Sequence, residues 1–246
     1  MTVDLEVLPD AGSVARRAAM LFVETVRAAH ADGRDAHVVV TGGGTGISVL
    51  AEIAQHADEL DWARVHVWWG DERFVPHDSN DRNDVQADEA LLAQVVIPTE
   101  QVHRVPASDG PYGDDPDAAA AAYAEELARH APAGAPGPLF DVLMLGMGEE
   151  GHTASIFPHS PAAADARPVC AVRDCPKPPP TRVTMTWELL SHATEVWMMT
   201  TGAGKAAAVE AALSGADRMA VPAAGPQGRE RTRWLLDQSA AGRLPS

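Results

Sequence analysis

Apolar runs of strand length alternate along this chain with segments of helical periodicity, and glycine-bearing turns separate several of them. The β-branched run at 37–40 ends at a Thr-Gly-Gly-Gly-Thr turn, after which apolar residues recur at Ile47, Leu50 and Ile53. Neighbouring parallel strands require crossover connections, which are usually helices. The alternation therefore predicts an α/β fold, with a Rossmann-like, mainly parallel sheet and helices on both faces.

The same alternation continues to the end of the chain. Helical spacing or composition predicts further helices at 13–29, 84–96, 116–130 and 205–213. Apolar or β-branched runs predict strands at 64–69, 139–145, 169–172, 182–186, 195–200 and 233–236. A polar loop is expected from Gly70 to Asn83, and Asn83 is the predicted N-cap of the helix that follows it.

The length and charge of the chain limit its architecture and its partners. A chain of 246 residues with 46% hydrophobic residues can bury a substantial core, and we expect one domain over residues 1–246. The formal net charge of −16 argues against binding to nucleic acid or to anionic membranes. Any anionic ligand must therefore find a local group of basic residues.

The sequence also indicates a compartment. It contains no Lys/Arg-flanked apolar segment at the N-terminus typical of export and no uninterrupted apolar segment of bilayer length, so we expect a cytoplasmic protein. Cys170 and Cys175 are the only cysteines. They provide no disulfide framework and no second metal-binding pair, and we expect both to be reduced bystanders.

A glycine-bent loop that carries a histidine follows the strand predicted at 139–145. Gly146, Gly148 and Gly151 match the G-x-G-x-x-G pattern of dinucleotide sites, but Pro158 and the prolines after it leave no room for the long helix that such a site needs. The loop instead presents His152, whose imidazole suits proton transfer near neutral pH. The alternative is a histidine that only satisfies local backbone groups.

The first glycine turn is a candidate phosphate site. Gly42, Gly43, Gly44 and Thr45 stand at the start of a predicted helix, where backbone amides and the helix dipole favour an anion. A tight turn that needs positive φ is the alternative. The turn is not a P-loop, because no Gly-Lys-Ser/Thr sequence follows it.

Three cations are candidates for contacts with such an anion. Arg73 belongs to the Asp71-Glu72-Arg73 run directly after a predicted strand, and Arg182 follows a stiff proline run. Lys205 lies in the first turn of its helix, where a cation is unfavourable unless it meets an anion. Each of these residues has the alternative role of an exposed surface charge.

The remaining tryptophans, methionines and histidines have simpler interpretations. Trp68, Trp69, Trp187 and Trp197, with Met144, Met147, Met198 and Met199, lie in apolar segments and are expected to pack in the core. His66, His103 and His159 have no partners visible in the sequence and are expected to be structural or exposed. No cluster has the spacing of a zinc site.

Together these segments resemble the 6-phosphogluconolactonase family of the glucosamine-6-phosphate isomerase/deaminase-like superfamily. The resemblance runs from the first predicted helix to the Trp-Leu-Leu-Asp sequence at 234–237. The matching segments are 41–45, 71–76, Arg82-Asn83, 145–148, 151–158, 182–184 and Gly202 with Lys205.

The resemblance implies hydrolysis of 6-phospho-D-glucono-1,5-lactone to 6-phosphogluconate in the oxidative pentose phosphate pathway. It implies that His152 is the general base for water, with Asp71 and Arg73 as further candidate catalytic residues. It places the loop Gly42 to Thr45, with Arg73, Arg182 and Lys205, around the substrate phosphate and polar edge. It implies no metal or organic cofactor, a small phosphosugar lactone as the ligand, and no obligate protein partner.

Two other functions remain open on the same scaffold. An aminosugar-phosphate isomerase or deaminase would use a similar phosphate site. Against it, the residues after His152 read Thr-Ala-Ser-Ile-Phe-Pro and lack the acidic and amide groups of the deaminase-like Ile-Ala-Phe-Asn-Glu-Pro. A noncatalytic phosphosugar-binding module would keep the cations but would not need His152.

Overall fold

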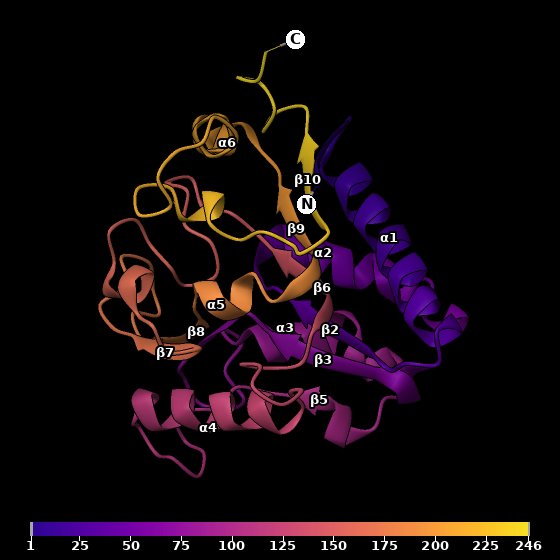
Figure 1. The fold of residues 1–246 in the computed structure, drawn as a ribbon, viewed down its shortest axis with the longest axis vertical. Coiled ribbons are helices and arrows are strands. Elements are labelled where there is room, and N and C mark those ends of the chain that lie inside the picture. The colour runs from indigo at the N-terminus through magenta and orange to yellow at the C-terminus, as the bar shows by residue number, and fades with distance from the viewer. Residues whose placement is uncertain (1, 246) are drawn as a thin grey trace.

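The computed structural model describes residues 2–245, and its centre is a seven-stranded sheet in which every neighbouring pair is parallel (Figure 1). The strand order is β1-β10-β9-β6-β2-β3-β5. The bounds of these strands are β1 Thr2–Leu8, β2 Ala36–Val40, β3 Val65–Trp69, β5 Val102–His103, β6 Phe140–Leu145, β9 Ala193–Thr200 and β10 Arg231–Asp237. The predicted α/β class and mainly parallel sheet are confirmed.

Helices flank this sheet (Figure 1). Their bounds are α1 Ala11–Ala31, α2 Gly43–Ala54, α3 Asn83–Ala90, α4 Pro116–Arg129, α5 Trp187–Leu190 and α6 Ala206–Leu213. Asp10 caps α1, because its side chain accepts a hydrogen bond from the backbone amide of Ser13 at 2.7 Å. The apolar face of the helix is buried. α1 packs against α2, and α2 packs in turn against α3.

A second, three-stranded antiparallel sheet lies beside the first. It consists of β4 Asp71–Arg73, β8 Arg182–Met185 and β7 Val169–Val172 in that order. The sequence predicted β7 and β8 as strands but not their antiparallel pairing, and the prediction of a loop over the residues of β4 is wrong. The short connection at 173–181 contains no helix, so β7 and β8 cannot be joined by a crossover and pair antiparallel instead.

The prediction of a helix at 84–96 is also wrong in its extent. α3 ends at Ala90, Leu91 leaves the helical conformation with φ −143°, and a short 3-10 turn follows. The side-chain amide of Gln94 donates to the carbonyls of Glu89 and Ala90, which stand at the end of the helix. These carbonyls have no partners within the helix, so the glutamine stabilises its termination.

Asn83 does not cap α3 as the sequence predicted. It is the first residue of the helix, and its side-chain amide donates to the carbonyl of Asp71 at 2.8 Å. The capping group is the carboxylate of Glu72, which accepts hydrogen bonds from the backbone amides of Asn83 at 2.7 Å and Asp84 at 2.9 Å. A carboxylate at this end also meets the positive end of the helix dipole.

The strands β1 and β5 were not predicted. β1 lies at the edge of the sheet and pairs only with β10, and Val3, Leu5 and Val7 remain about half exposed. β5 is the opposite edge strand and contains only two residues. Edge strands bury less apolar surface than central strands, so their sequence pattern is weaker.

The core fills the space between the sheets and the helices. Trp68, Trp69 and Trp197 are fully buried, as their apolar context predicts. Cys170 and Cys175 are buried and both are free thiols. Burial raises the pKa of the Cys170 thiol to about 12 and also raises that of Cys175, which keeps both thiols protonated at neutral pH.

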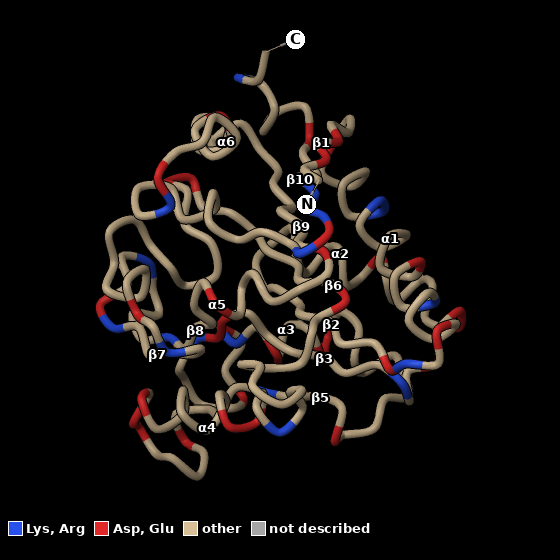
Figure 2. Tube along the Cα trace, viewed as in Figure 1, with Lys and Arg blue, Asp and Glu red and all other residues tan. Residues whose placement is uncertain are grey.

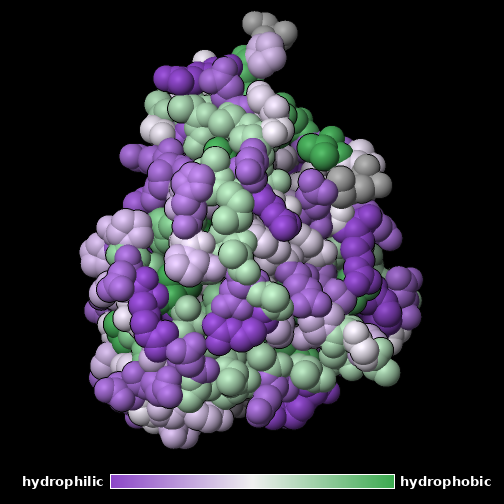
Figure 3. Space-filling model, turned by 60° about the vertical axis from the view of Figure 1, so that its left-hand side comes forward, coloured by the Kyte–Doolittle hydropathy of each residue, from purple (hydrophilic) through white to green (hydrophobic). Residues whose placement is uncertain are grey.

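The surface is acidic and mixed in polarity. The 19 Lys and Arg residues are scattered among 35 Asp and Glu residues (Figure 2). On the face shown in Figure 3, hydrophilic and hydrophobic residues are interspersed. Among residues 2–245, no helix combines the length and the apolar character needed to cross a membrane.

Candidate active site

Three glycine-bearing turns, at Gly42, Gly146 and Gly202, lie at one edge of the sheet. They follow β2, β6 and β9, which are adjacent in the sheet, and they enclose a pocket of about 400 Å³ at the carboxyl ends of these strands. Every residue that the sequence singled out as catalytic or phosphate-binding lines this pocket. These residues are Gly42, Gly43, Gly44, Thr45, Asp71, Arg73, His152, Arg182 and Lys205.

The glycine turn after β2 leads directly into α2, with Gly42 at the N-cap and the next two glycines in the first turn of the helix. A Cβ at Gly42 would lie 1.8 Å from Oδ1 of Asn83, so only glycine allows this close approach. The first backbone amides of α2 have no partners within the helix. The turn can therefore offer amides to an anion in the pocket.

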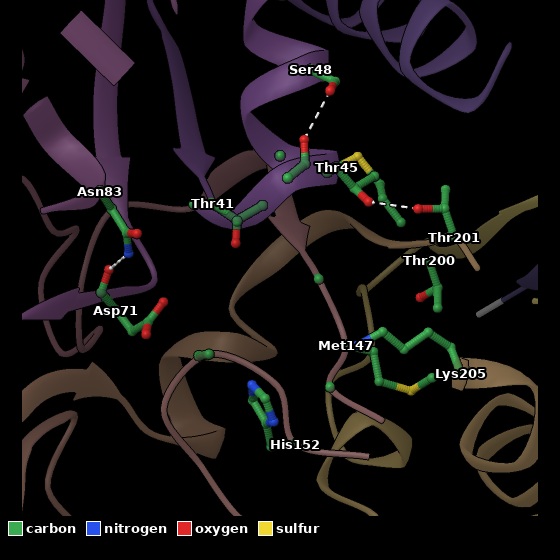
Figure 4. A pocket seen from close by; sticks show the side chains of 18 of the residues that line it. Thr41, Thr45, Ser48, Asp71, Asn83, Met147, His152, Thr200, Thr201 and Lys205 are labelled. Carbon is green, nitrogen blue, oxygen red and sulfur yellow. Dashed lines mark hydrogen bonds between the residues drawn. The ribbon is translucent and has the colours of Figure 1, made fainter. Parts of the chain in front are cut away.

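His152 lies on the loop after β6, opposite the glycine turn (Figure 4). Its Nδ1 is 3.0 Å from Oε1 of Glu150, and the other oxygen of Glu150 accepts a hydrogen bond from Lys177 at 2.9 Å. The imidazole stacks on Phe157 with 4.4 Å between ring centroids. A Cβ at Gly148 would lie 1.9 Å from Nδ1, so glycine is required where the loop passes the ring.

Burial and charge set the protonation states of this pair. Burial lowers the pKa of His152, although the nearby Glu150 carboxylate opposes the shift. Burial alone would raise the pKa of Glu150, but the hydrogen bond from Lys177 and the proximity of His152 lower it to about 2. At neutral pH a neutral imidazole therefore donates its Nδ1 proton to an ionised carboxylate, and Nε2 keeps a free lone pair.

Asp71 lies between the loop that carries His152 and the side chain of Arg182. Ser155, on the same loop as His152, donates from Oγ to Oδ2 of Asp71 at 2.5 Å, and Nη1 of Arg182 lies 4.0 Å from the same oxygen. Arg182 is buried, and its Nε and Nη2 donate to the carbonyls of residues 177–179. The proline run that preceded Arg182 in the sequence thus fixes the guanidinium at the pocket wall.

Arg73 is placed by the short strand β4. Its Nη1 donates to the carbonyl of Asp81 at 2.6 Å. Its Nε is buried and has no hydrogen-bond partner in the part of the chain that the structure describes. A buried donor without a partner is costly, so this nitrogen is suited to an anionic or carbonyl oxygen of a ligand.

Lys205 approaches the pocket from the far side. It is the N-cap of α6, and its side chain extends into the pocket across from Asp71 and Asn83 (Figure 4). Burial lowers the pKa of Lys205, the charge of Lys177 lowers it further, and Glu149 and Glu150 oppose the shift. No hydrogen bond to Lys205 is formed within residues 2–245 other than through its backbone, so the ammonium group is available to an anion.

A family model described as glucosamine-6-phosphate isomerases/6-phosphogluconolactonase matches residues 9–234. The chain belongs to this family. It is 49% identical over 247 residues to the 6-phosphogluconolactonase of Mycobacterium tuberculosis, and the alignment covers 100% of both chains. It is 46% identical over 253 residues to the 6-phosphogluconolactonase of Streptomyces coelicolor, covering 99% of this chain and 95% of the relative.

The solved structure of the 6-phosphogluconolactonase from Trypanosoma brucei has the same fold. It superposes with a TM-score of 0.84 at 28% sequence identity, and the match covers 99% of each chain. The resemblance drawn from the sequence motifs is therefore confirmed at the level of the family and of the whole fold.

Three residues at or beside the pocket were not predicted to contribute to the site. Glu150 and Lys177 support His152 from two different loops, and Thr200 places a buried hydroxyl without a partner among residues 2–245 at the pocket wall. Glu150 lies two residues before His152 in the sequence, and this short separation could have indicated their contact. The contact of Lys177 is formed by a loop distant in sequence and carries no local pattern.

Proposed function

We propose that this chain hydrolyses 6-phospho-D-glucono-1,5-lactone to 6-phosphogluconate, with His152 as the general base for water. The main support for the proposal is the content of one pocket. It contains an imidazole that is hydrogen-bonded to a carboxylate, the backbone amides at the start of α2 and three cationic side chains. The full-length relatives named 6-phosphogluconolactonase support the same reaction.

The proton chemistry follows from the contacts of His152. Its Nδ1–H donates to Glu150, so Nε2 is free to take a proton from a water molecule as that water attacks the lactone carbonyl. The tetrahedral intermediate collapses with cleavage of the bond between the carbonyl carbon and the ring oxygen. The proton held by Nε2 then passes to the leaving oxygen, and the imidazole is regenerated.

The developing oxyanion needs donors that are already in place. Arg73 offers its Nε, which has no hydrogen-bond partner among residues 2–245, and the backbone amides of the glycine turns are further donors. A lactone carbonyl is already electrophilic, so a base and such donors are sufficient for hydrolysis. The proposed reaction requires no metal or organic cofactor.

The phosphate provides orientation. In a protein of net charge −16, the pocket gathers Arg73, Arg182 and Lys205 next to the amides at the start of α2. A phosphate dianion bound there fixes the sugar ring and holds the lactone carbonyl near His152. The translational and rotational entropy of the substrate is then lost on binding and not in the chemical step. The remote phosphate thus contributes to the rate and not only to binding.

The test of this proposal compares two reactions of the purified chain. We expect rapid hydrolysis of freshly generated lactone, measured above the spontaneous background, and no steady release of ammonia from glucosamine 6-phosphate. Ammonia release faster than lactone hydrolysis would favour the deaminase function. Binding of 6-phosphogluconate without either reaction would favour the noncatalytic module.

The pH dependence of the reaction depends on Glu150. Because burial lowers the pKa of His152 below its ordinary value of 6.5, activity is retained above that folded-state pKa and lost as the imidazole protonates below it. Glu150→Gln removes the carboxylate charge that opposes this shift but keeps an acceptor for Nδ1. We therefore expect the acid limb of kcat/KM to move to lower pH.

The control for this experiment is Glu149→Gln, which removes a neighbouring charge that does not contact the imidazole. The substrate phosphate titrates near the same pH, but it contributes equally to the profiles of all three proteins. An acid limb that stays in place or moves to higher pH in Glu150→Gln would contradict the proposed role of His152.

A further inference from the structure

Four histidines form a cluster away from the candidate active site. His37 and His66 are each the second residue of their strands, β2 and β3, whereas the pocket lies beyond the last residues of β2. His103 comes from β5 and His130 is the C-cap of α4. The cluster thus connects neighbouring strands to the end of a helix that covers them.

Three of these rings converge on one point. Nδ1 of His66 lies 2.9 Å from Nε2 of His103, and the two rings are nearly parallel at 16°. His130 meets both rings at steep angles, 60° to His66 and 72° to His103. One ring nitrogen from each of the three histidines lies within 4.8 Å of the others, and no other such group of three or more occurs in residues 2–245.

A carboxylate fixes the orientation of the central ring. Oε1 of Glu126 is 2.7 Å from Nδ1 of His103 and 3.4 Å from Nε2 of His130. His103 therefore donates its Nδ1 proton to Glu126, and its Nε2 keeps a lone pair directed at His66. Metal-binding histidines are typically held in this way, with the second ring nitrogen donating to a carboxylate.

We propose that His66, His103 and His130 bind a divalent transition metal ion of the zinc type, with Glu126 as the residue that positions His103. Zinc–nitrogen bonds of about 2.0–2.1 Å place tetrahedral ligand nitrogens about 3.3 Å apart, close to the observed separation of the first two rings. Imidazole ligands favour Zn²⁺, Ni²⁺ and Cu²⁺ over Mg²⁺ and Ca²⁺.

The site has an entry path and an evident structural effect. The side chains of His130 and Glu126 are 30% and 26% exposed, so an ion can reach the buried His103 from solvent. With three protein ligands, a fourth position remains for water. An ion held there would tie the end of α4 to β3 and β5, which already pair with each other in the sheet.

The spacing of these residues explains why the sequence predicted no zinc site. His66, His103 and His130 lie 37 and 27 positions apart and have no local ligand pattern. The sequence predicted that His66 and His103 are structural or exposed, and a packed histidine stack without a metal is the competing interpretation. The two interpretations differ in what the protein binds.

The test is titration of the metal-free full-length protein with ZnCl₂ by calorimetry, together with the visible spectrum of the Co²⁺ form. We expect one site per chain, a several-degree rise in Tm on saturation, and at least tenfold weaker binding in His130→Gln. Glu126→Gln leaves all three ligands but should weaken binding about 10–100-fold. Far-UV circular dichroism of the metal-free variants verifies that each is folded.

Two controls locate the ion. His56→Gln changes a half-exposed histidine elsewhere, and His152→Gln removes the imidazole of the active-site pocket; both should bind Zn²⁺ as the parent does. Wild-type affinity in both His130→Gln and Glu126→Gln, or no binding at one equivalent, would show a packed histidine stack only. Neither readout measures catalysis, so failure of this inference leaves the proposed lactonase function untouched.

Discussion

His152→Ala is expected to lower kcat for lactone hydrolysis by about 10²–10⁴-fold, the usual contribution of a general base. The substitution removes the nitrogen that takes the proton from water but leaves the cations and the amides at the start of α2 in place. We expect the affinity for 6-phosphogluconate, measured by calorimetry, to change little. The effect should therefore appear in kcat and not in KM.

The matched control for this variant is His77→Ala, because His77 is an exposed histidine outside the pocket. Its rate should equal that of the parent after subtraction of spontaneous hydrolysis. If His152→Ala hydrolyses the lactone at the parent rate, the base is another group. If it loses rate and product affinity together, the loss has a structural cause.

Arg82→Met is expected to lower the free energy of unfolding by about 3–5 kcal/mol, as in other proteins where one partner of a buried ion pair is removed. The Arg82 side chain is only 1% exposed and donates to both carboxylate oxygens of Asp84, at 2.8 and 2.9 Å. It also donates to the carbonyl of Val105 at 2.7 Å and lies 3.8 Å from the carboxylate of Glu72. Methionine fills a similar volume but compensates none of these groups.

The loss should be specific to the buried site. Arg27 forms an ion pair with Glu59 at the surface, where its side chain is 62% exposed, so Arg27→Met should change the free energy of unfolding by less than about 1 kcal/mol. Urea denaturation of both variants measures the difference. Equal effects of the two substitutions would contradict the assignment of Arg82 as a principal structural contact of α3 and β4.

The sequence predicted the central architecture because that information is local. A β-branched run, a glycine turn and a helical period are each visible within about fifteen residues, and parallel strands bring their carboxyl ends to one edge. For this reason Gly42, His152 and Lys205 could be expected in one pocket although they lie far apart in the chain. The pocket combines them as expected.

The parts that the sequence missed depend on contacts between distant segments. Nothing near Ser155 indicates its hydrogen bond to Asp71, which lies 84 positions earlier. The cap of α3 is likewise supplied by Glu72 and not by the adjacent Asn83, because β4 places that carboxylate over the first amides of the helix. Tertiary placement overrides local capping preference here.

The proposed function depends on a pocket that binds a phosphate dianion and holds the lactone beside a neutral imidazole. The most direct measurement compares kcat/KM for 6-phospho-D-glucono-1,5-lactone and for D-glucono-1,5-lactone with the same preparation of wild-type protein. Binding energy from a remote group is expressed in the rate, so we expect a preference of at least about 10³-fold for the phosphorylated lactone. Equal values for the two lactones would show that the pocket does not use the phosphate to position the substrate.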